Sequence, residues 1–172
     1  FAANAPPSSS GDGGERRRLL SSGQTPLAII LGCSDSRVPA ELVFDQGLGD
    51  LFVIRVAGNI VASSQVDSVE FAAARFKTRL VVVLGHSQCG AILATVEELQ
   101  QPPGHQSRSL RSIVDRVRPS VESLLATELR HDADALVREA VRANIRASVD
   151  HLKHGSDVLE RLIAQEGLLV VG

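Results

Sequence analysis

The chain has 172 residues, of which 44% are hydrophobic and 22% charged, a composition typical of one folded domain. Its formal net charge is −2, so it offers no basic field for nucleic acid and no polybasic patch for anionic lipid. It lacks Trp, Tyr and Met, which makes a base-stacking surface hard to build. The longest apolar runs, Leu27–Leu31 and Leu80–Leu84, are too short to span a bilayer. We therefore expect neither nucleic acid nor a membrane as a partner.

Cys33 and Cys89 are the two cysteines of the chain. They could form one disulfide at most, which is too few for a secreted disulfide-bonded scaffold. Each follows a strand-like run and stands beside other residues that can bind metals, so metal or thiol chemistry is favoured over a structural disulfide. With free thiols and no visible export signal, we expect a cytoplasmic location by default, although a segment upstream of residue 1 could carry such a signal.

Residues 1–23 are expected to form a mobile N-terminal arm, because they are rich in Pro, Ser and Gly. One short helical turn is predicted around Glu15–Leu20, and we interpret the cations of Arg16–Arg18 as a solvated cluster. Residues 24–172 are expected to form a single domain. The chain ends one residue after its last predicted strand, which favours a truncated C-terminus or a disordered tail.

Short apolar runs that alternate with helix-like segments indicate the fold class. The predicted strands are Leu27–Leu31, Leu51–Val56, Leu80–Leu84 and Leu168–Val171. The predicted helices are Val66–Phe76 with Ser63–Ser64 as cap candidates, Ala91–Leu99 stopped by Pro102–Gly104, Ser109–Val117 and Val121–Leu129 separated by Pro119, Ala133–Leu152, and a helix that begins at Ser156 and runs through Ile163. This alternation predicts an α/β fold, with a mostly parallel sheet of about four to five strands and helices on both faces.

Two loops that follow predicted strands carry side chains that can bind a metal or take part in catalysis. The first contains Cys33, and the second contains His86 and Cys89. Functional groups collect at the carboxyl ends of parallel strands, and Zn²⁺ prefers thiolate and imidazole ligands in a tetrahedral array. The His-x-x-Cys spacing lets His86 and Cys89 face one ion, and Cys33 would approach from the neighbouring strand. Three protein ligands leave a fourth position for water, as in catalytic zinc sites.

Asp35 has two possible roles beside this site. It could bind zinc as a fourth ligand and close the site. Alternatively it could pair with Arg37, whose planar guanidinium can hold a carboxylate in a fixed geometry, and accept a hydrogen bond from zinc-bound hydroxide. Two thiolates cancel the charge of Zn²⁺, so we expect this hydroxide to form at higher pH than at a three-histidine site, where the pKa of the bound water is about 7.

Simpler explanations exist for each of these residues alone. A lone cysteine is more often a small core residue than a ligand, a zinc ion could be purely structural, and Asp35 and Arg37 could form an ordinary salt bridge. These explanations would all have to hold at once, and that is improbable because all the residues concerned follow strand ends: Cys33, Asp35, Arg37, His86 and Cys89.

At these residues the sequence resembles the β-class carbonic anhydrases. The match runs through CSDSRVPAE (Cys33–Glu41), GDLFVIRVAGN (Gly49–Asn59) and LVVVLGHSQCGA (Leu80–Ala91). The resemblance implies reversible hydration of carbon dioxide to bicarbonate and a proton, on zinc, in a homodimer or tetramer. It implies that Cys33, His86 and Cys89 are the zinc ligands. It also implies that Asp35 and Arg37 form a dyad that gates the metal and orients its hydroxide.

The resemblance also implies a substrate pocket. Gln24 would be the pocket glutamine that reaches a neighbouring subunit's site, Phe52 and Ala57 would line an apolar wall, and the backbone N–H of Gly90 would face the product anion. Phe71 stands where many members carry a pocket Tyr, so a hydroxyl is lost. Without Tyr or Trp, the aromatic-lined non-catalytic bicarbonate pocket of some bacterial members cannot be built in its familiar form.

The mechanism implied is attack of zinc-bound hydroxide on carbon dioxide held against the apolar wall. His105, His131, His151 and His154 could relay the proton, but each is more often an ordinary surface histidine, so none is assigned. Two alternatives remain open. The same site could hydrolyse carbon disulfide or carbonyl sulfide, or a closed four-ligand zinc could serve only to stabilise the subunit.

Overall fold

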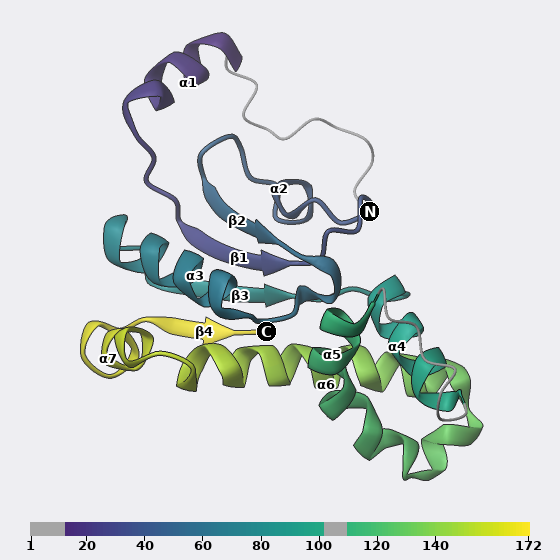
Figure 1. Ribbon diagram of the computed structural model, residues 1–172. Helices are drawn as coiled ribbons and strands as arrows, with labels where there is room; N and C mark the ends of the chain where they lie inside the picture. The colour runs from purple at the N-terminus through teal and green to yellow at the C-terminus, as the bar shows by residue number, and fades with distance from the viewer. Residues whose placement is uncertain (1–12, 102–109) are drawn as a thin grey trace.

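A four-stranded parallel sheet organises the chain (Figure 1). The computed structural model describes residues 13–101 and 110–172. The strands are β1 (Ala28–Gly32), β2 (Leu51–Arg55), β3 (Leu80–Leu84) and β4 (Leu169–Val171), in the spatial order β2-β1-β3-β4. The predicted α/β fold with a mostly parallel sheet is confirmed, and each strand lies within one residue of its predicted bounds.

Seven α-helices and three short 3₁₀ turns occur in the described ranges. The helices are α1 (Gly13–Leu19), α2 (Ala40–Val43), α3 (Ser63–Arg75), α4 (Gly90–Gln100), α5 (Arg111–Leu125), α6 (Ala133–His154) and α7 (Asp157–Glu166). The 3₁₀ turns are η1 (Leu20–Ser22), η2 (Ala57–Asn59) and η3 (Glu128–His131). No helix of the described residues is both long and apolar enough to cross a bilayer.

The two faces of the sheet are covered unequally. On one face, Ile29 and Leu31 of β1 pack with buried residues of α3, α6 and α7 in the main apolar core. Ile30 points to the opposite face because side chains alternate along a strand. There it packs with Ala40 of the four-residue α2 and with half-buried residues of β2 and β3. Large apolar side chains stay exposed on α2, the loop after it and β4: Leu42, Val43, Phe44, Leu48, Leu169 and Val171.

A second apolar cluster lies beyond the carboxyl ends of the strands, where α4, α5 and the first part of α6 pack together (Figure 1). Its buried members include Cys33 and Cys89 together with Ile92, Val117 and Leu136. The two cysteines therefore lie between the end of the sheet and this helical cluster, away from solvent.

The predicted division of the helices around Pro119 was wrong. Pro119 does not separate two helices, because α5 runs from Arg111 to Leu125 through it. The predicted helix end at Leu129 was wrong as well, since Leu129 lies in the η3 turn. Val114, Val117 and Val121 keep one side of α5 buried on both sides of the proline, while Pro119 itself is exposed. Proline donates no hydrogen bond and its ring crowds the preceding turn, which disfavours the helix. Pro119 lies on the solvent side, where water can bind the carbonyl left without a donor, and the buried side holds the helix together.

The cap of α3 also differs from the prediction. Ser63 is the first helical residue and Ala62 occupies the N-cap. The side-chain oxygen of Gln65 accepts a hydrogen bond of 3.2 Å from the backbone N–H of Ala62. This glutamine, three residues past the cap, satisfies the amide of the N-cap residue itself, which is one half of a capping box. No side chain accepts from the amides of the first turn, so neither Ser63 nor Ser64 acts as the cap.

The predicted helical turn near the N-terminus is confirmed, since α1 and η1 cover residues 13–22. The interpretation of Arg16 as a solvated charge is wrong: its Nε donates to the Leu48 carbonyl at 2.8 Å, and its Nη2 forms an ion pair with Asp50. The mobility of the arm stays a prediction. Residues 1–12, the expected stop at Pro102–Gly104 and the predicted helix start at Ser109 lie outside the described residues.

Ser156 begins α7 as predicted, and its hydroxyl oxygen accepts from the N–H groups of Val158 and Leu159 at 3.1 and 3.2 Å. We expect Ser156→Ala to lower the free energy of unfolding by about 1 kcal/mol, because both amides lose their acceptor. Urea denaturation measures this change. Ser68→Ala is the control, because its exposed hydroxyl bonds only within α3 and should change stability little. Equal stability of the two variants would contradict a capping role for Ser156.

Candidate metal centre

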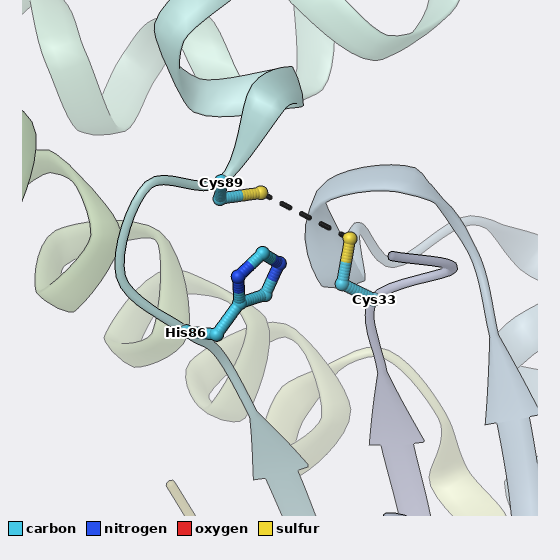
Figure 2. Close-up of side chains that lie close together, drawn as sticks. All are labelled: Cys33, His86 and Cys89. Atoms are coloured by element: carbon cyan, nitrogen blue, oxygen red, sulfur yellow. Dashed lines mark hydrogen bonds between the residues drawn. The ribbon is translucent and has the colours of Figure 1, made fainter. Parts of the chain in front are cut away.

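The ends of β1 and β3 bring three metal-binding side chains together. Cys33 directly follows β1, His86 lies two residues past β3, and Cys89 is the N-cap of α4. Because Gly32 pairs with Leu84, these two strands end level with each other. The ligand atoms of the three residues all lie within 4.8 Å of one another, and Figure 2 shows the imidazole beside the two sulfur atoms. The structure thus brings together the three residues that the sequence predicted as ligands.

The spacing of these atoms fits a tetrahedral zinc ion. Zinc–sulfur bonds of about 2.3 Å at the tetrahedral angle place two sulfurs about 3.8 Å apart, and the Sγ atoms of Cys33 and Cys89 are 3.9 Å apart. His86 Nδ1 lies 2.9 Å from the Ser87 carbonyl oxygen. A carbonyl only accepts, so Nδ1 carries the proton and Nε2 presents a lone pair.

His86 Nε2 itself is buried and has no hydrogen-bond partner. A buried polar atom without a partner is costly, and here it lies beside two buried sulfurs. A metal ion would satisfy this lone pair and both sulfurs at once, so the donor set fits Zn²⁺ on the chemistry of its own atoms.

The two thiols share a hydrogen bond, and this contact sets their acidity. The pKa of Cys33 is lowered, first by the hydrogen bond with Cys89 and further by contacts with His86 and the Gly58 amide, against the opposing effect of burial. The pKa of Cys89 is raised, first by the same shared hydrogen bond and then by burial. The shared hydrogen bond therefore favours the thiolate form at Cys33, whose pKa it lowers, and the thiol form at Cys89, whose pKa it raises.

Gly58, in the η2 turn, donates its N–H to Cys33 Sγ at 3.3 Å. Its φ is +69°, and a Cβ on it would lie 2.9 Å from the Cβ of Ala91. Both the left-handed backbone and the close approach of α4 therefore require glycine here.

Asp35 is held by Arg37 rather than turned fully to the metal-binding atoms. Arg37 Nε and Nη2 donate to the two carboxylate oxygens at 2.8 and 2.7 Å, and the Arg37 backbone N–H adds a bond of 3.0 Å. The bidentate bond with this guanidinium is the main reason that the pKa of Asp35 lies well below its usual range. Asp35 Oδ2 is nevertheless 3.9 Å from His86 Nε2, so the carboxylate stands at the edge of the centre.

Sequence reasoning missed Arg55 at the end of β2. Its Nε donates to the Cys33 carbonyl at 3.0 Å, and its Nη2 donates to the Asp35 carbonyl at 2.6 Å. One guanidinium thus fixes the backbone on both sides of Ser34. The available signal was a cation at the end of an otherwise apolar strand, LFVIR.

The residues predicted for the substrate pocket fall into two places. Ala57 precedes Gly58 in η2, and Gly90 begins α4 directly after Cys89, with open space where a Cβ would lie. Phe52 is different: it pairs with Ile29, four residues before Cys33, which is about 13 Å along the strand.

Gln24 and Phe71 also lie away from the metal-binding atoms of their own chain. Gln24 precedes the amino end of β1 and shares a cavity of about 630 Å³ with Phe76. The Phe52, Phe71 and Phe76 rings form one cluster, with centroids 5.6–6.3 Å apart, and Phe71 is 54% exposed.

The histidines considered as proton relays are not part of the cluster of metal-binding atoms. His131 lies in η3, and His151 and His154 lie near the end of α6, all of them exposed. His105 lies outside the described residues.

Comparison with known sequences identifies relatives along the whole chain. A family model described as carbonic anhydrase matches residues 28–172. Carbonic anhydrase 2 of Mycobacterium tuberculosis is 41% identical over 177 aligned residues, which cover 100% of this chain and 80% of that protein. A carbonic anhydrase of Mycolicibacterium smegmatis is 47% identical over 110 residues, or 62% of this chain and 52% of that protein.

Solved structures agree with the sequence relatives. A β-carbonic anhydrase of Aspergillus fumigatus superposes with a TM-score of 0.80 at 26% identity, covering 92% of this chain and 74% of that one. One of two tetrameric β-carbonic anhydrases from Sordaria macrospora superposes with a TM-score of 0.79 at 27% identity, covering 92% and 79%. In sequence and in fold, the chain belongs to the β-carbonic anhydrase family of enzymes.

Proposed function

We propose that this chain catalyses the reversible hydration of carbon dioxide to bicarbonate and a proton, at a zinc ion held by Cys33, His86 and Cys89. The observation that carries the proposal is the buried, partnerless Nε2 of His86 beside two sulfurs at zinc-binding separation. Membership in the family supports the same reaction. When bound, zinc at a three-ligand site supplies an activated water for attack on carbon dioxide.

Asp35 and Arg37 are proposed to control the fourth position. In the paired arrangement, the Asp35 carboxylate lies 3.9 Å from His86 Nε2 and can accept a hydrogen bond from a water molecule in the centre, which orients that water. Arg37 holds the carboxylate in this role through its two bonds. Release from Arg37 would allow Asp35 to become a fourth ligand, so pairing and closure compete for one carboxylate.

A second copy of the chain is proposed to complete the substrate pocket, in a homodimer or tetramer. Gln24, Phe52 and Phe71 lie toward the opposite end of the strands from their own chain's Cys33, so they would serve a neighbouring subunit. Ala57 and Gly90 would form the near side of the pocket. The thinly covered sheet face supports association, because burying the exposed Leu169 and Val171 against another subunit is favourable.

The pairing of Asp35 with Arg37 favours an open catalytic site over a closed structural zinc. Stopped-flow assays with carbon dioxide, carbon disulfide and carbonyl sulfide separate the proposed reaction from hydrolysis of the sulfur-containing gases. The proposal expects carbon dioxide to be the preferred substrate. Absence of hydration activity even in alkaline buffer would favour the structural zinc.

Removal of one ligand should remove metal and activity together. We expect Cys33→Ala and His86→Ala to lose bound zinc and carbon dioxide hydration, because two remaining ligands bind the ion too weakly. Elemental analysis and stopped-flow rates measure the two losses. His131→Ala, at an exposed histidine, is the control and should retain both. Full activity in a metal-depleted variant would refute the ligand assignment.

Asp35→Asn should separate metal binding from turnover. The amide keeps the shape of the carboxylate but cannot accept through two charged oxygens, so we expect zinc to stay bound and kcat to fall about 100-fold. Asp115→Asn, which alters an exposed pair with Arg111 on α5, is the matched control with unchanged kcat. Wild-type rates in Asp35→Asn would remove this carboxylate from the mechanism.

Zinc affinity should rise with pH. Because the pKa of Cys89 is raised and that of Cys33 is lowered, the metal-free pair retains one proton that zinc must displace. One displaced proton makes the apparent affinity increase about tenfold per pH unit. Competition with a chromophoric chelator between about pH 7.5 and 8.5, above the usual range of imidazole, measures this slope. A pH-independent affinity would contradict the shared-proton pair.

A further inference from the structure

The buried side of α6 carries two polar residues in an otherwise apolar row. Its members are spaced four residues apart, so that they share one face of the helix: Leu136, Ala140, Asn144, Ser148 and Leu152. Asn144 is only 3% exposed and Ser148 only 5% exposed. Burial of an amide and a hydroxyl is unfavourable unless they form hydrogen bonds. The hydrogen-bond partners of Asn144 and Ser148 therefore indicate the role of these two side chains.

Both side chains bind consecutive carbonyls of the η2 turn. Asn144 Nδ2 donates to the Gly58 carbonyl at 2.8 Å, and Ser148 Oγ donates to the Asn59 carbonyl at 3.0 Å. Gly58 and Asn59 both have left-handed backbones, with φ of +69° and +43°. Glycine and asparagine tolerate this region better than other residues, but glycine is equally free to leave it. The bonds from Asn144 and Ser148 therefore select one conformation of a turn whose local sequence permits several.

Gly58 also faces the metal centre. Its carbonyl accepts from Asn144 while its N–H donates to Cys33 Sγ. The close approach of Ala91 on α4 limits how the residue can move. A direct series of contacts thus runs from the middle of α6, through Gly58, to a sulfur that we assign as a zinc ligand.

We propose that Asn144, supported by Ser148, is a positioning residue of the metal centre, which keeps the Gly58 N–H directed at the Cys33 sulfur. This inference rests on the proposed zinc ligand set. A hydrogen bond to a ligand atom fixes the orientation of that ligand, and loss of such an orienting partner commonly weakens metal binding or activity about 10- to 100-fold. Because Asn144 acts through Gly58, we expect an effect at the low end of that range.

A purely structural role for Asn144 would give different results. In that case its only function is to satisfy a buried carbonyl, and its loss would lower stability without changing the cysteine sulfur. Ser120 supplies a matched control, because its buried hydroxyl has no hydrogen-bond partner. Ser120→Ala deletes a buried polar group on α5 without removing a bond to η2.

The test uses Co²⁺ in place of zinc, because thiolate-to-cobalt absorption bands report on the sulfur directly. We expect Asn144→Ala to move these bands to lower energy, since the thiolate loses a hydrogen bond that stabilises its lone pairs. The variant should also release Co²⁺ to excess chelator about tenfold faster. Ser148→Ala should change both in the same direction by less, and Ser120→Ala should match the unaltered protein. Thermal melting of each metal-free variant records the structural cost separately.

Each outcome of this experiment supports or refutes the positioning role of Asn144. Unchanged bands and release rate in Asn144→Ala, with only a lower melting temperature, would overturn the positioning role while leaving the ligand set intact. If Asn144→Ala does not fold, Ser148→Ala decides: shifted bands support the inference and unshifted bands refute it. If the unaltered protein shows no thiolate bands with Co²⁺, the ligand assignment fails first, and this inference fails with it.

Discussion

Gly32 pairs with Arg55 on one side and with Leu84 on the other, so the three strands β1, β2 and β3 end level with one another. This register places Cys33, Arg55 and the loop carrying His86 at one edge of the sheet. A slip of one residue would turn a strand's side chains to the opposite faces, and the apolar core on α3, α6 and α7 prevents such a slip. The same packing that stabilises the fold therefore also sets the separation of the candidate ligands.

The surroundings of the centre combine low polarity with a small number of directed polar groups. Cys33 and Cys89 belong to the apolar cluster of α4, α5 and α6, which keeps solvent from the sulfur side. Gly58 donates to one sulfur, Ser87 fixes the imidazole tautomer, and Arg55 fixes the loop backbone. Because interactions between charges are stronger in a poorly hydrated site, these few contacts can govern how the three candidate ligands would hold a divalent ion.

The strands and the candidate ligands could be predicted from the sequence, because both depend on patterns among residues close together in the chain. Apolar runs marked every strand, and the spacing of Cys33, His86 and Cys89 indicated one ion. Contacts from side chains to distant carbonyls were not predictable, because any residue offers a carbonyl and Asn144 lies 86 positions from Gly58. Arg55 was missed for the same reason. Pro119 misled the helix boundaries because tertiary packing of the valines on α5 outweighs a local helix breaker.

The sequence of one chain also does not indicate which subunit of an assembly a group of aromatic residues would serve. Phe52 and Phe71 cluster with Phe76 beside α3, and no local pattern indicates which copy of the chain such a cluster would serve.

Arg37 joins the two loops of the centre through one guanidinium. Its Nη2 binds the Asp35 carboxylate at 2.7 Å and the Gln88 carbonyl at 3.1 Å. Gln88 has a left-handed backbone, with φ of +54°, and directly precedes Cys89. The carboxylate beside one candidate ligand and the strained peptide beside another thus share a single donor group. A swing of Asp35 away from Arg37 would leave that guanidinium bound to the Gln88 carbonyl alone, so the position of the carboxylate determines how firmly the second loop is tied to the first.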